Sequence, residues 1–374
     1  MGLSLKSQLL FREFAEKEFT PELLRELDET GKFNREIFEK IARAGFTGIK
    51  IPREYGGQGC DSLTYVIMIE EFARVSPVLS IYANTSNSLG SGPLLICGNE
   101  EQKMKYLPAL ASGEKILVFG LSEPNAGTDA ASLTSFAEEK EDCFILNGRK
   151  VFTSGAPIAD YTVIFARTDR SQKGSRGISV FIVDMSLPGV TCGKPEAKMG
   201  IKGYPTSDVI LEDVRVPKDC LVGSLHTGYS AAMKTLDGGR LGMAAQAVGI
   251  AQAVLDISTQ CLKERTQSGG DYQGDMFTLA EMAAELEAAR QLVYHTAVLC
   301  DTGDAESSKL CAMSKFYAAE MCNRHASKAI QICGREAYDK ECTLERFYRD
   351  ARITTIYEGT SQVQQIVISR GLLK

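Results

Sequence analysis

The chain of 374 residues contains no tryptophan and only three histidines, His226, His295 and His325. So few histidines leave little material for a histidine-based catalytic triad or metal site. The eleven cysteines are scattered, without a C-x-x-C pair or a cluster with histidine at zinc spacing. This usage suits a reducing compartment better than a disulfide framework. We therefore expect neither a metal site nor a fold held together by disulfides.

Several other signatures are missing. The chain has no G-x-x-x-x-G-K-[ST] loop, no strand-linked G-x-G-x-x-G and no H-E-x-x-H motif. No apolar run approaches the length of a membrane span, and the first residues do not form a signal peptide. The net charge of −6 argues against nucleic acid or an anionic membrane as the main partner. We expect a cytoplasmic protein, or one in an organelle matrix if a presequence has been removed.

Three patterns follow one another along the chain. Residues 1–112 carry apolar residues at helical spacing. Residues 113–225 change to short apolar or alternating runs, and Asn147-Gly148 and Gly174-Ser175 are typical of hairpin turns. Residues 226–374 return to long helical patterns with few breakers. The sequence therefore predicts a helical domain, an antiparallel β domain and a second helical domain, in that order.

Near the end of the chain a glutamate precedes a glycine, in the stretch Tyr357-Glu358-Gly359-Thr360. A glycine there can adopt positive φ and let backbone and ligand approach closely, and the N–H groups of such a turn can donate to an oxyanion. A carboxylate that is desolvated by burial has a raised pKa and can act as a general base. The four residues alone, however, more often mark a solvated glutamate in an ordinary turn between helices.

A second stretch, residues 119–129, reads FGLSEPNAGTD. Together with the YEGT residues and a match along nearly the whole chain, it resembles the acyl-CoA dehydrogenase family, most closely the short-chain, butyryl-CoA type. These flavoenzymes oxidise acyl-CoA thioesters to enoyl-CoA. The resemblance implies an N-terminal helical domain, a middle antiparallel β-barrel and a C-terminal four-helix bundle. It also implies FAD as cofactor, electron-transfer flavoprotein as redox partner, and a homodimer or homotetramer.

The resemblance assigns the catalytic base. It implies that Glu358 removes the α-proton of the thioester while hydride leaves the β-carbon for flavin N5. In isovaleryl-type members a glutamate on the first long helix of the last domain stands where this chain has Gly239. A glycine cannot be a base, so Glu358 is the one candidate at the two locations. The Gly238-Gly239 pair should weaken its helix by roughly 2 kcal/mol in total relative to alanines. Close approach of a ligand would account for it, and a helix kink is the alternative.

Further residues acquire roles through the same resemblance. The implied flavin contacts are Phe119, Leu121, Ser122, Phe152, Thr153, Ser154, Arg265, Gln267, Gln331, Arg335, Thr360 and Gln362. The implied contacts with the acyl-CoA are Thr128, Tyr357, Gly359, Asp237 and Arg240. The region of the acyl pocket is expected to include Tyr82, Leu89, Ser91 and Leu95. Because Asp237 and Arg240 are three residues apart on a helix, they could simply pair with each other.

Two segments depart from the family's pattern. Members usually carry R-x-Q-F-G-R-P-I where this chain has residues 265–271, with Ser268 in place of the phenylalanine. Members also carry Q-x-x-G-G-x-G-Y, and Arg335 replaces the second glycine here. In the family both segments touch FAD across a subunit interface. A glycine lets backbone approach a pyrophosphate, whereas Arg335 could pair with the phosphates instead. Weakened and rewired FAD binding therefore both stay open.

The sequence favours the first of three functions and leaves the other two as alternatives. The first is dehydrogenation of a short-chain acyl-CoA, or the reverse reduction by the same residues. The second is the same chemistry on a thioester bound to a carrier protein or on a substituted acyl-CoA. The third is a scaffold or non-redox binding protein that has lost FAD.

Overall fold

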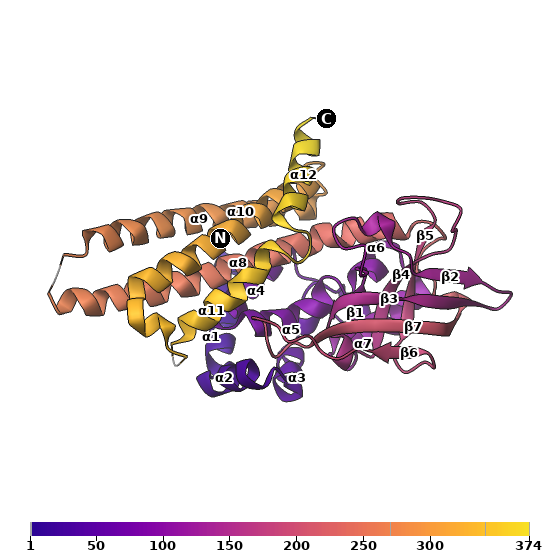
Figure 1. Cartoon of the computed structure of the whole chain (residues 1–374), viewed down its shortest axis with the longest axis horizontal. Coiled ribbons are helices and arrows are strands. Elements are labelled where there is room, and N and C mark those ends of the chain that lie inside the picture. The colour runs from indigo at the N-terminus through magenta and orange to yellow at the C-terminus, as the bar shows by residue number, and fades with distance from the viewer. Residues whose placement is uncertain (1, 270, 341, 374) are drawn as a thin grey trace.

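The computed structural model describes residues 2–269, 271–340 and 342–373. Helices come first, then a sheet, then a second set of helices, which confirms the predicted order (Figure 1). Side-chain caps begin several of the first helices: Thr20, Asn34, Asp61, Ser76 and Asn99 each accept a backbone N–H from the first turn. These helices are α1 (Gly2–Glu18), α2 (Pro21–Thr30), α3 (Arg35–Arg43), α4 (Ser62–Val75), α5 (Pro77–Asn87), α6 (Gly92–Cys97) and α7 (Glu100–Ala111).

The middle of the chain forms the expected β domain, as one curled sheet. Its strands are β1 (Leu117–Gly120), β2 (Phe136–Glu139), β3 (Cys143–Ser154), β4 (Tyr161–Arg167), β5 (Ile178–Asp184), β6 (Val190–Cys192) and β7 (Thr206–Pro217). The strand order is β1-β4-β2-β3-β7-β6, and β5 pairs with β4. Most pairs are antiparallel, but β1 runs parallel to β4, so the sheet is mixed.

The two predicted hairpin turns have different outcomes. Gly174-Ser175 lies in the loop that joins the antiparallel strands β4 and β5, as predicted. Asn147-Gly148 is not a turn: it lies inside β3, where the register with β7 shifts between Leu146 and Gly148. The Asn147 side chain donates to the Asp213 carboxylate and accepts from the Asp213 N–H, at 3.0 and 2.9 Å. The extra residue at this shift lies on β7, where Asp213 has φ of 51°, so the β-bulge belongs to β7 and Asn147 holds it from the facing strand.

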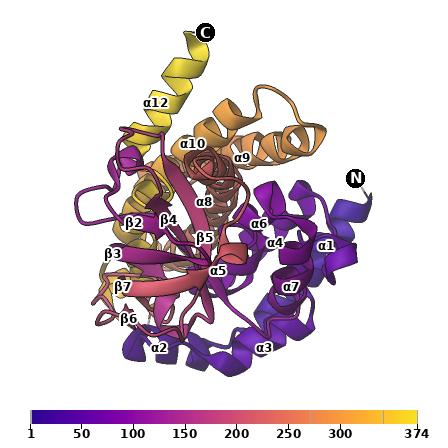
Figure 2. The ribbon, with the colours of Figure 1, turned by 90° about the vertical axis from the view of Figure 1, so that its right-hand side faces the viewer.

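The last domain is built on α8 (Gly228–Gln267), α9 (Gln273–Thr302) and α10 (Ser307–Cys333), followed by α11 (Thr343–Ala351) and α12 (Ser361–Leu372). By length and composition α8 would suffice to cross a membrane, but 78% of its apolar window is buried inside the protein. It is the central core helix, packed against α4, α9 and α10. At the C-terminus α12 projects from the body (Figures 1 and 2).

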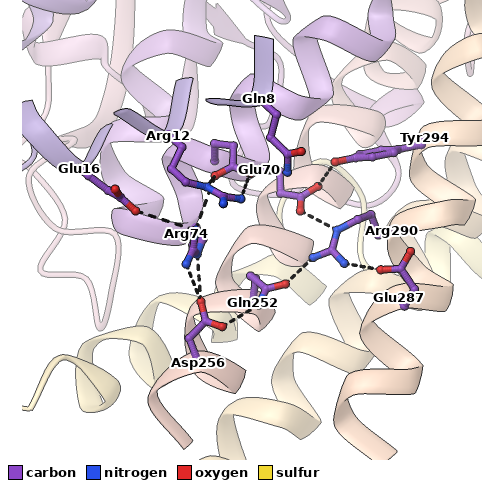
Figure 3. Close-up of polar contacts among 11 residues, drawn as sticks. Gln8, Arg12, Glu16, Glu70, Arg74, Gln252, Asp256, Glu287, Arg290 and Tyr294 are labelled. Atoms are coloured by element: carbon purple, nitrogen blue, oxygen red, sulfur yellow. Dashed lines mark hydrogen bonds and ion pairs between the residues drawn. The ribbon is translucent and has the colours of Figure 1, made fainter. Parts of the chain in front are cut away.

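Charged side chains of α4 join the first helices to the last domain (Figure 3). Glu70 and Glu71 are only 3% and 2% exposed. Arg12 of α1 donates twice to the Glu71 carboxylate, at 2.9 and 2.8 Å. Arg290 and Tyr294 of α9 donate to the two oxygens of Glu70, both at 2.8 Å. Because a buried carboxylate without its cation is strongly destabilising, this network fixes how α4 sits on the bundle, and α4 lies against the candidate site.

Candidate active site

The candidate site centres on a strained turn between the 3₁₀ helix η7 (Arg352–Thr355) and α12. Glu358 has φ of 50° and Gly359 has φ of 93°. Positive φ is uncommon for a residue other than glycine and has to be held by its surroundings. Lys315 of α10 donates to the Gly359 carbonyl at 2.7 Å. Gln364 of α12 donates to the carbonyls of Glu358 and Gly359 at 3.2 and 2.8 Å.

The turn places the Glu358 carboxylate over α8 at Gly239. A Cβ atom built on Gly239 would lie 2.1 Å from Glu358 Oε2 and 3.2 Å from the Leu89 side chain. Glycine is therefore required there to make room for the carboxylate, and α8 continues through Gly238-Gly239 as a helix. The two positions that carry a base in the family thus meet at one point. Leu89 thus lies beside this point, and its place in an acyl pocket stays a prediction.

Glu358 is half-buried, and one oxygen of its carboxylate is removed from solvent. Its Oε2 is buried and makes no hydrogen bond with the residues that the structure describes. Burial raises the pKa of Glu358 to about 7, against the opposing charges of Lys315 and Arg240. A carboxyl group with this pKa can both take and give a proton near neutral pH. The solvated glutamate of an ordinary turn, which is the alternative from the four-residue motif, is not what the chain forms.

Asp237 and Arg240 pair with each other through a hydrogen-bonded ion pair, as the helical spacing allowed. Arg240 is 5% exposed, and its Nε makes no hydrogen bond within the described residues. The Tyr357 side chain also has a partner within the protein, because its hydroxyl is hydrogen-bonded to the side-chain oxygen of Gln246 on α8. Contacts of these residues and of the exposed Thr128 with an acyl-CoA stay predictions.

A buried ion pair fixes the loop after β1. Lys150 and Glu123 are 0% and 3% exposed on their side chains, with Lys150 Nζ 2.7 Å from Glu123 Oε1. Lys150 also donates to the Leu121 carbonyl at 3.2 Å, and Glu123 accepts from the N–H groups of Thr134 and Ser135 at 2.6 and 3.0 Å. Although burial opposes it, this partnership lowers the pKa of Glu123 to about 2. The loop carrying Leu121 is therefore tied to β3.

Two segments of the β domain that are expected to contact the flavin are distant in sequence but lie close together in the structure. Phe119 at the end of β1 packs on Phe165, with ring centroids 4.9 Å apart. The Ser122 carbonyl accepts from the N–H of Val151 at 2.9 Å, so the loop lies against β3 just before Phe152. These contacts place the two expected segments, residues 119–122 and 152–154, next to each other.

Residues 152–154 have the features of a contact surface. Phe152 has φ of 53°, and 68% of it is exposed. The Thr153 hydroxyl is buried and makes no hydrogen bond with the described residues. The Ser154 hydroxyl lies 3.3 Å from that of Thr206. An exposed aromatic ring in an unfavourable backbone conformation, beside an unpartnered hydroxyl, fits the planar ring of a flavin.

A pocket of about 460 Å³ lies on the other side of the Glu358 turn. Its lining includes Thr360 and Gln362, both expected as cofactor contacts, together with Glu320, Asn323 and Arg352. The Thr360 hydroxyl also accepts the Val363 N–H at 3.3 Å and so begins α12. This pocket is polar and separate from the space between Glu358 and Gly239.

Four expected cofactor residues lie far from Glu358 within one chain. Arg265 is about 37 Å further along α8 than Arg240, at 1.5 Å per residue. It forms an ion pair with Asp275, at 3.2 Å, and donates to the Ile332 carbonyl. Gln267, Gln331 and Arg335 are exposed at the same end, opposite the sheet in Figure 1. Gly270, within the altered segment 265–271, lies outside the described residues.

Sequence models of known domain families match the chain in order. The N-terminal domain of acyl-CoA dehydrogenase matches residues 7–114, its middle domain residues 118–214 and its C-terminal domain residues 226–373.

The chain belongs to the acyl-CoA dehydrogenase family.

Sequence matches to known relatives span almost the whole chain. The caffeyl-CoA reductase–Etf complex subunit CarC of Acetobacterium woodii is 53% identical over 98% of this chain and 97% of its own length. The 3-(aryl)acrylate reductase of Clostridium sporogenes is 48% identical over the same shares. Among solved structures, butyryl-CoA dehydrogenase from Megasphaera elsdenii superposes with a TM-score of 0.94 at 38% identity, covering 98% of each chain.

Sequence reasoning missed four residues that shape the site: Lys315, Gln364, Glu123 and Lys150. Lys315 acts on Gly359, 44 residues away, and Lys150 pairs with Glu123, 27 residues away, whereas Gln364 contacts the Glu358 turn only five and six residues before it. A lysine within a helical pattern carries no local signal of burial. Only the structure shows that Lys315 is 1% exposed.

Proposed function

We propose that the chain interconverts an acyl thioester and its 2-enoyl form, with Glu358 exchanging the proton at the α-carbon. The observation that carries the proposal is the buried Oε2 of Glu358, which is held over Gly239 and makes no hydrogen bond with the described residues. FAD is the cofactor and, when bound, supplies the hydride acceptor or donor for the β-carbon. A non-redox scaffold is set aside, because the chain belongs to a family of oxidoreductases.

The chain's own residues support the proton transfer in three ways. A pKa of about 7 lets Glu358 act as base in the oxidation and as acid in the reduction. The Lys315 and Arg240 charges stabilise the ionised form after the proton has left. No hydrogen bond from the Glu358 backbone N–H occurs within the described residues. That N–H is free to donate to the thioester oxygen, where negative charge develops.

The names of the relatives favour a CoA thioester and the reductive direction. One relative is a caffeyl-CoA reductase subunit and another reduces 3-(aryl)acrylates, whereas a short-chain-specific acyl-CoA dehydrogenase is 42% identical. A prolyl acyl carrier protein oxidase is more distant, at 30% identity. We propose a short 2-enoyl-CoA substrate, with an aryl substituent at the β-carbon as the second candidate. A substrate on a carrier protein is the less favoured alternative.

The proposed partners are electron-transfer flavoprotein and further copies of the chain. The name of the caffeyl-CoA reductase subunit includes an Etf complex. A homodimer or homotetramer is proposed because Arg265, Gln331 and Arg335 lie too far from Glu358 to reach the same cofactor half within one chain. Light scattering that finds a monomer with full flavin content would contradict the oligomer.

The function is tested by product analysis. The purified protein should show a flavin spectrum, and anaerobic butanoyl-CoA should bleach it and form crotonyl-CoA. The dithionite-reduced protein should convert crotonyl-CoA or cinnamoyl-CoA to the saturated thioester, and mass spectrometry identifies which is converted faster. The same acyl groups on acyl carrier protein are the control. A protein that binds no flavin, or a bound flavin that no acyl or enoyl thioester reduces or oxidises, would refute the proposal.

A further inference from the structure

We propose that Lys315 and Gln364 are positioning residues for the Glu358 base: both hold its strained turn by the carbonyls, and Lys315 alone also sets a positive charge beside the carboxylate. The inference rests on the proposed role of Glu358. It concerns two residues that lie away from the reacting atoms and act through the backbone of the turn.

The polar contact of Lys315 serves the Glu358 turn. Its side chain comes from α10 and is 1% exposed. Its single described hydrogen bond runs from Nζ to the Gly359 carbonyl at 2.7 Å. Burying an ammonium group is costly unless it is hydrogen-bonded and paired. The nearby carboxylate of Glu358 provides that compensation.

Gln364 holds the same turn through an uncharged amide. It is fully buried on α12, and its Nε2 donates to the carbonyls of Glu358 and Gly359 at 3.2 and 2.8 Å. A Cβ on Gly359 would lie 2.7 Å from this nitrogen, so the amide is pressed against the turn. Positive φ is unfavourable for Glu358, and the turn requires such anchors to hold it.

The charges facing Glu358 single out Lys315. From α8 comes Arg240, whose positive charge is already paired with Asp237. From α4 comes the Tyr65 phenol, which donates to Asn84 Oδ1 at 2.5 Å, and Tyr357 precedes the base in the turn. Lys315 from α10 has only a carbonyl as its hydrogen-bond partner within the described residues. Burial lowers the pKa of Lys315 to about 8, so it keeps its proton at neutral pH.

The sign of the effect follows. The positive charge of Lys315 lowers the pKa of Glu358, against the larger effect of burial. Removing that charge leaves burial less opposed, so Glu358 should hold its proton to higher pH. Removing the Gln364 amide withdraws an anchor without changing any charge, so the position of the carboxylate should change while its titration does not.

The experiment uses the holoenzyme and two readouts. Infrared spectroscopy follows the protonated carboxyl band that is missing in Glu358→Gln, and its midpoint is titrated against pH. Anaerobic flavin bleaching by butanoyl-CoA gives the rate. Lys315→Met and Lys315→Gln remove the charge, and Lys315→Arg retains it. Gln364→Leu removes the neutral anchor. Lys328→Met is the matched control, since Lys328 lies on the same helix but pairs with Glu281 on α9.

Lys315→Met and Lys315→Gln should raise the infrared midpoint by about one pH unit, while Lys315→Arg, Gln364→Leu and Lys328→Met leave it unchanged. Gln364→Leu should slow bleaching about tenfold to a hundredfold, as expected for a displaced base. An unchanged midpoint in both uncharged variants would overturn the role of the charge, and a normal rate in Gln364→Leu would overturn the role of the anchor. Failure of wild type to react with any thioester would refute the proposed function separately, because the infrared midpoint does not depend on turnover.

Discussion

Replacing Gly239 with alanine should abolish most of the activity without harming the fold. The new Cβ would lie 2.1 Å from Glu358 Oε2, whereas ordinary contacts begin at 3.4 Å. The carboxylate therefore has to retreat by about 1 Å, and a misplacement of that size costs about 100-fold in rate. The group that moves is the end of a flexible side chain. The free energy of unfolding should therefore rise by part of the roughly 1 kcal/mol by which alanine is more favourable than glycine in a helix.

The neighbouring glycine provides a matched control. A Cβ on Gly238 would meet no described atom within 4 Å. Gly238→Ala should therefore raise stability by about 1 kcal/mol and leave catalysis unchanged. Both variants and wild type are compared by thermal melting and by the rate of anaerobic flavin bleaching with acyl-CoA. Equal rates in Gly239→Ala and Gly238→Ala would refute the placement of Glu358 over Gly239, as would a large loss of stability in Gly239→Ala alone.

Three further predictions follow from the same structure. Because burial raises the pKa of Glu358 from 4.5 to about 7, its protonated form favours folding, and that contribution is lost as pH rises through about 7. Melting temperatures should show wild type losing stability relative to Glu358→Gln over this range, and parallel curves would contradict it. Arg290→Leu should cost about 3–5 kcal/mol by leaving Glu70 buried without its cation, and Glu70→Leu added to it should recover part of the loss; a double variant no more stable than the single one would contradict this. Excess FAD should raise the melting temperature and activity of the protein as purified. The reason is that Ser268 and Arg335 each replace a usual FAD contact, at a cost of about 1–3 kcal/mol of binding free energy. If the purified protein is fully loaded and added FAD changes neither quantity, Arg335 binds the cofactor instead.

The order of elements could be predicted from the sequence because helical and strand periodicities are local. The same local reasoning failed at Asn147-Gly148. An Asn-Gly pair is typical of a turn, and only the pairing of β3 with β7 shows that it continues a strand opposite a bulge in β7. The parallel pairing of β1 with β4 was equally out of reach, since it joins segments that local patterns cannot relate.

The candidate site, too, could be predicted only in part. Glu358 was predicted through its family resemblance, and the structure adds the reason for Gly239, which no pattern within α8 contains. The anchoring by Lys315 could not be predicted, because Lys315 is 44 residues from its carbonyl partner. The buried pair of Glu123 and Lys150 was missed for the same reason. Charged residues normally signal a surface, and their burial is decided only by the packing of the whole chain.

The role of Glu358 as the base is tested most directly by Glu358→Gln in anaerobic stopped-flow mixing with butanoyl-CoA, or with the acyl-CoA that wild type accepts best. The amide matches the carboxyl group in shape but cannot take the α-proton. The variant should fold, retain its flavin spectrum and bleach about 100-fold to 10,000-fold more slowly than wild type. A variant that binds FAD and bleaches at a near-normal rate would show that another group removes the proton, and the account of this site would be wrong.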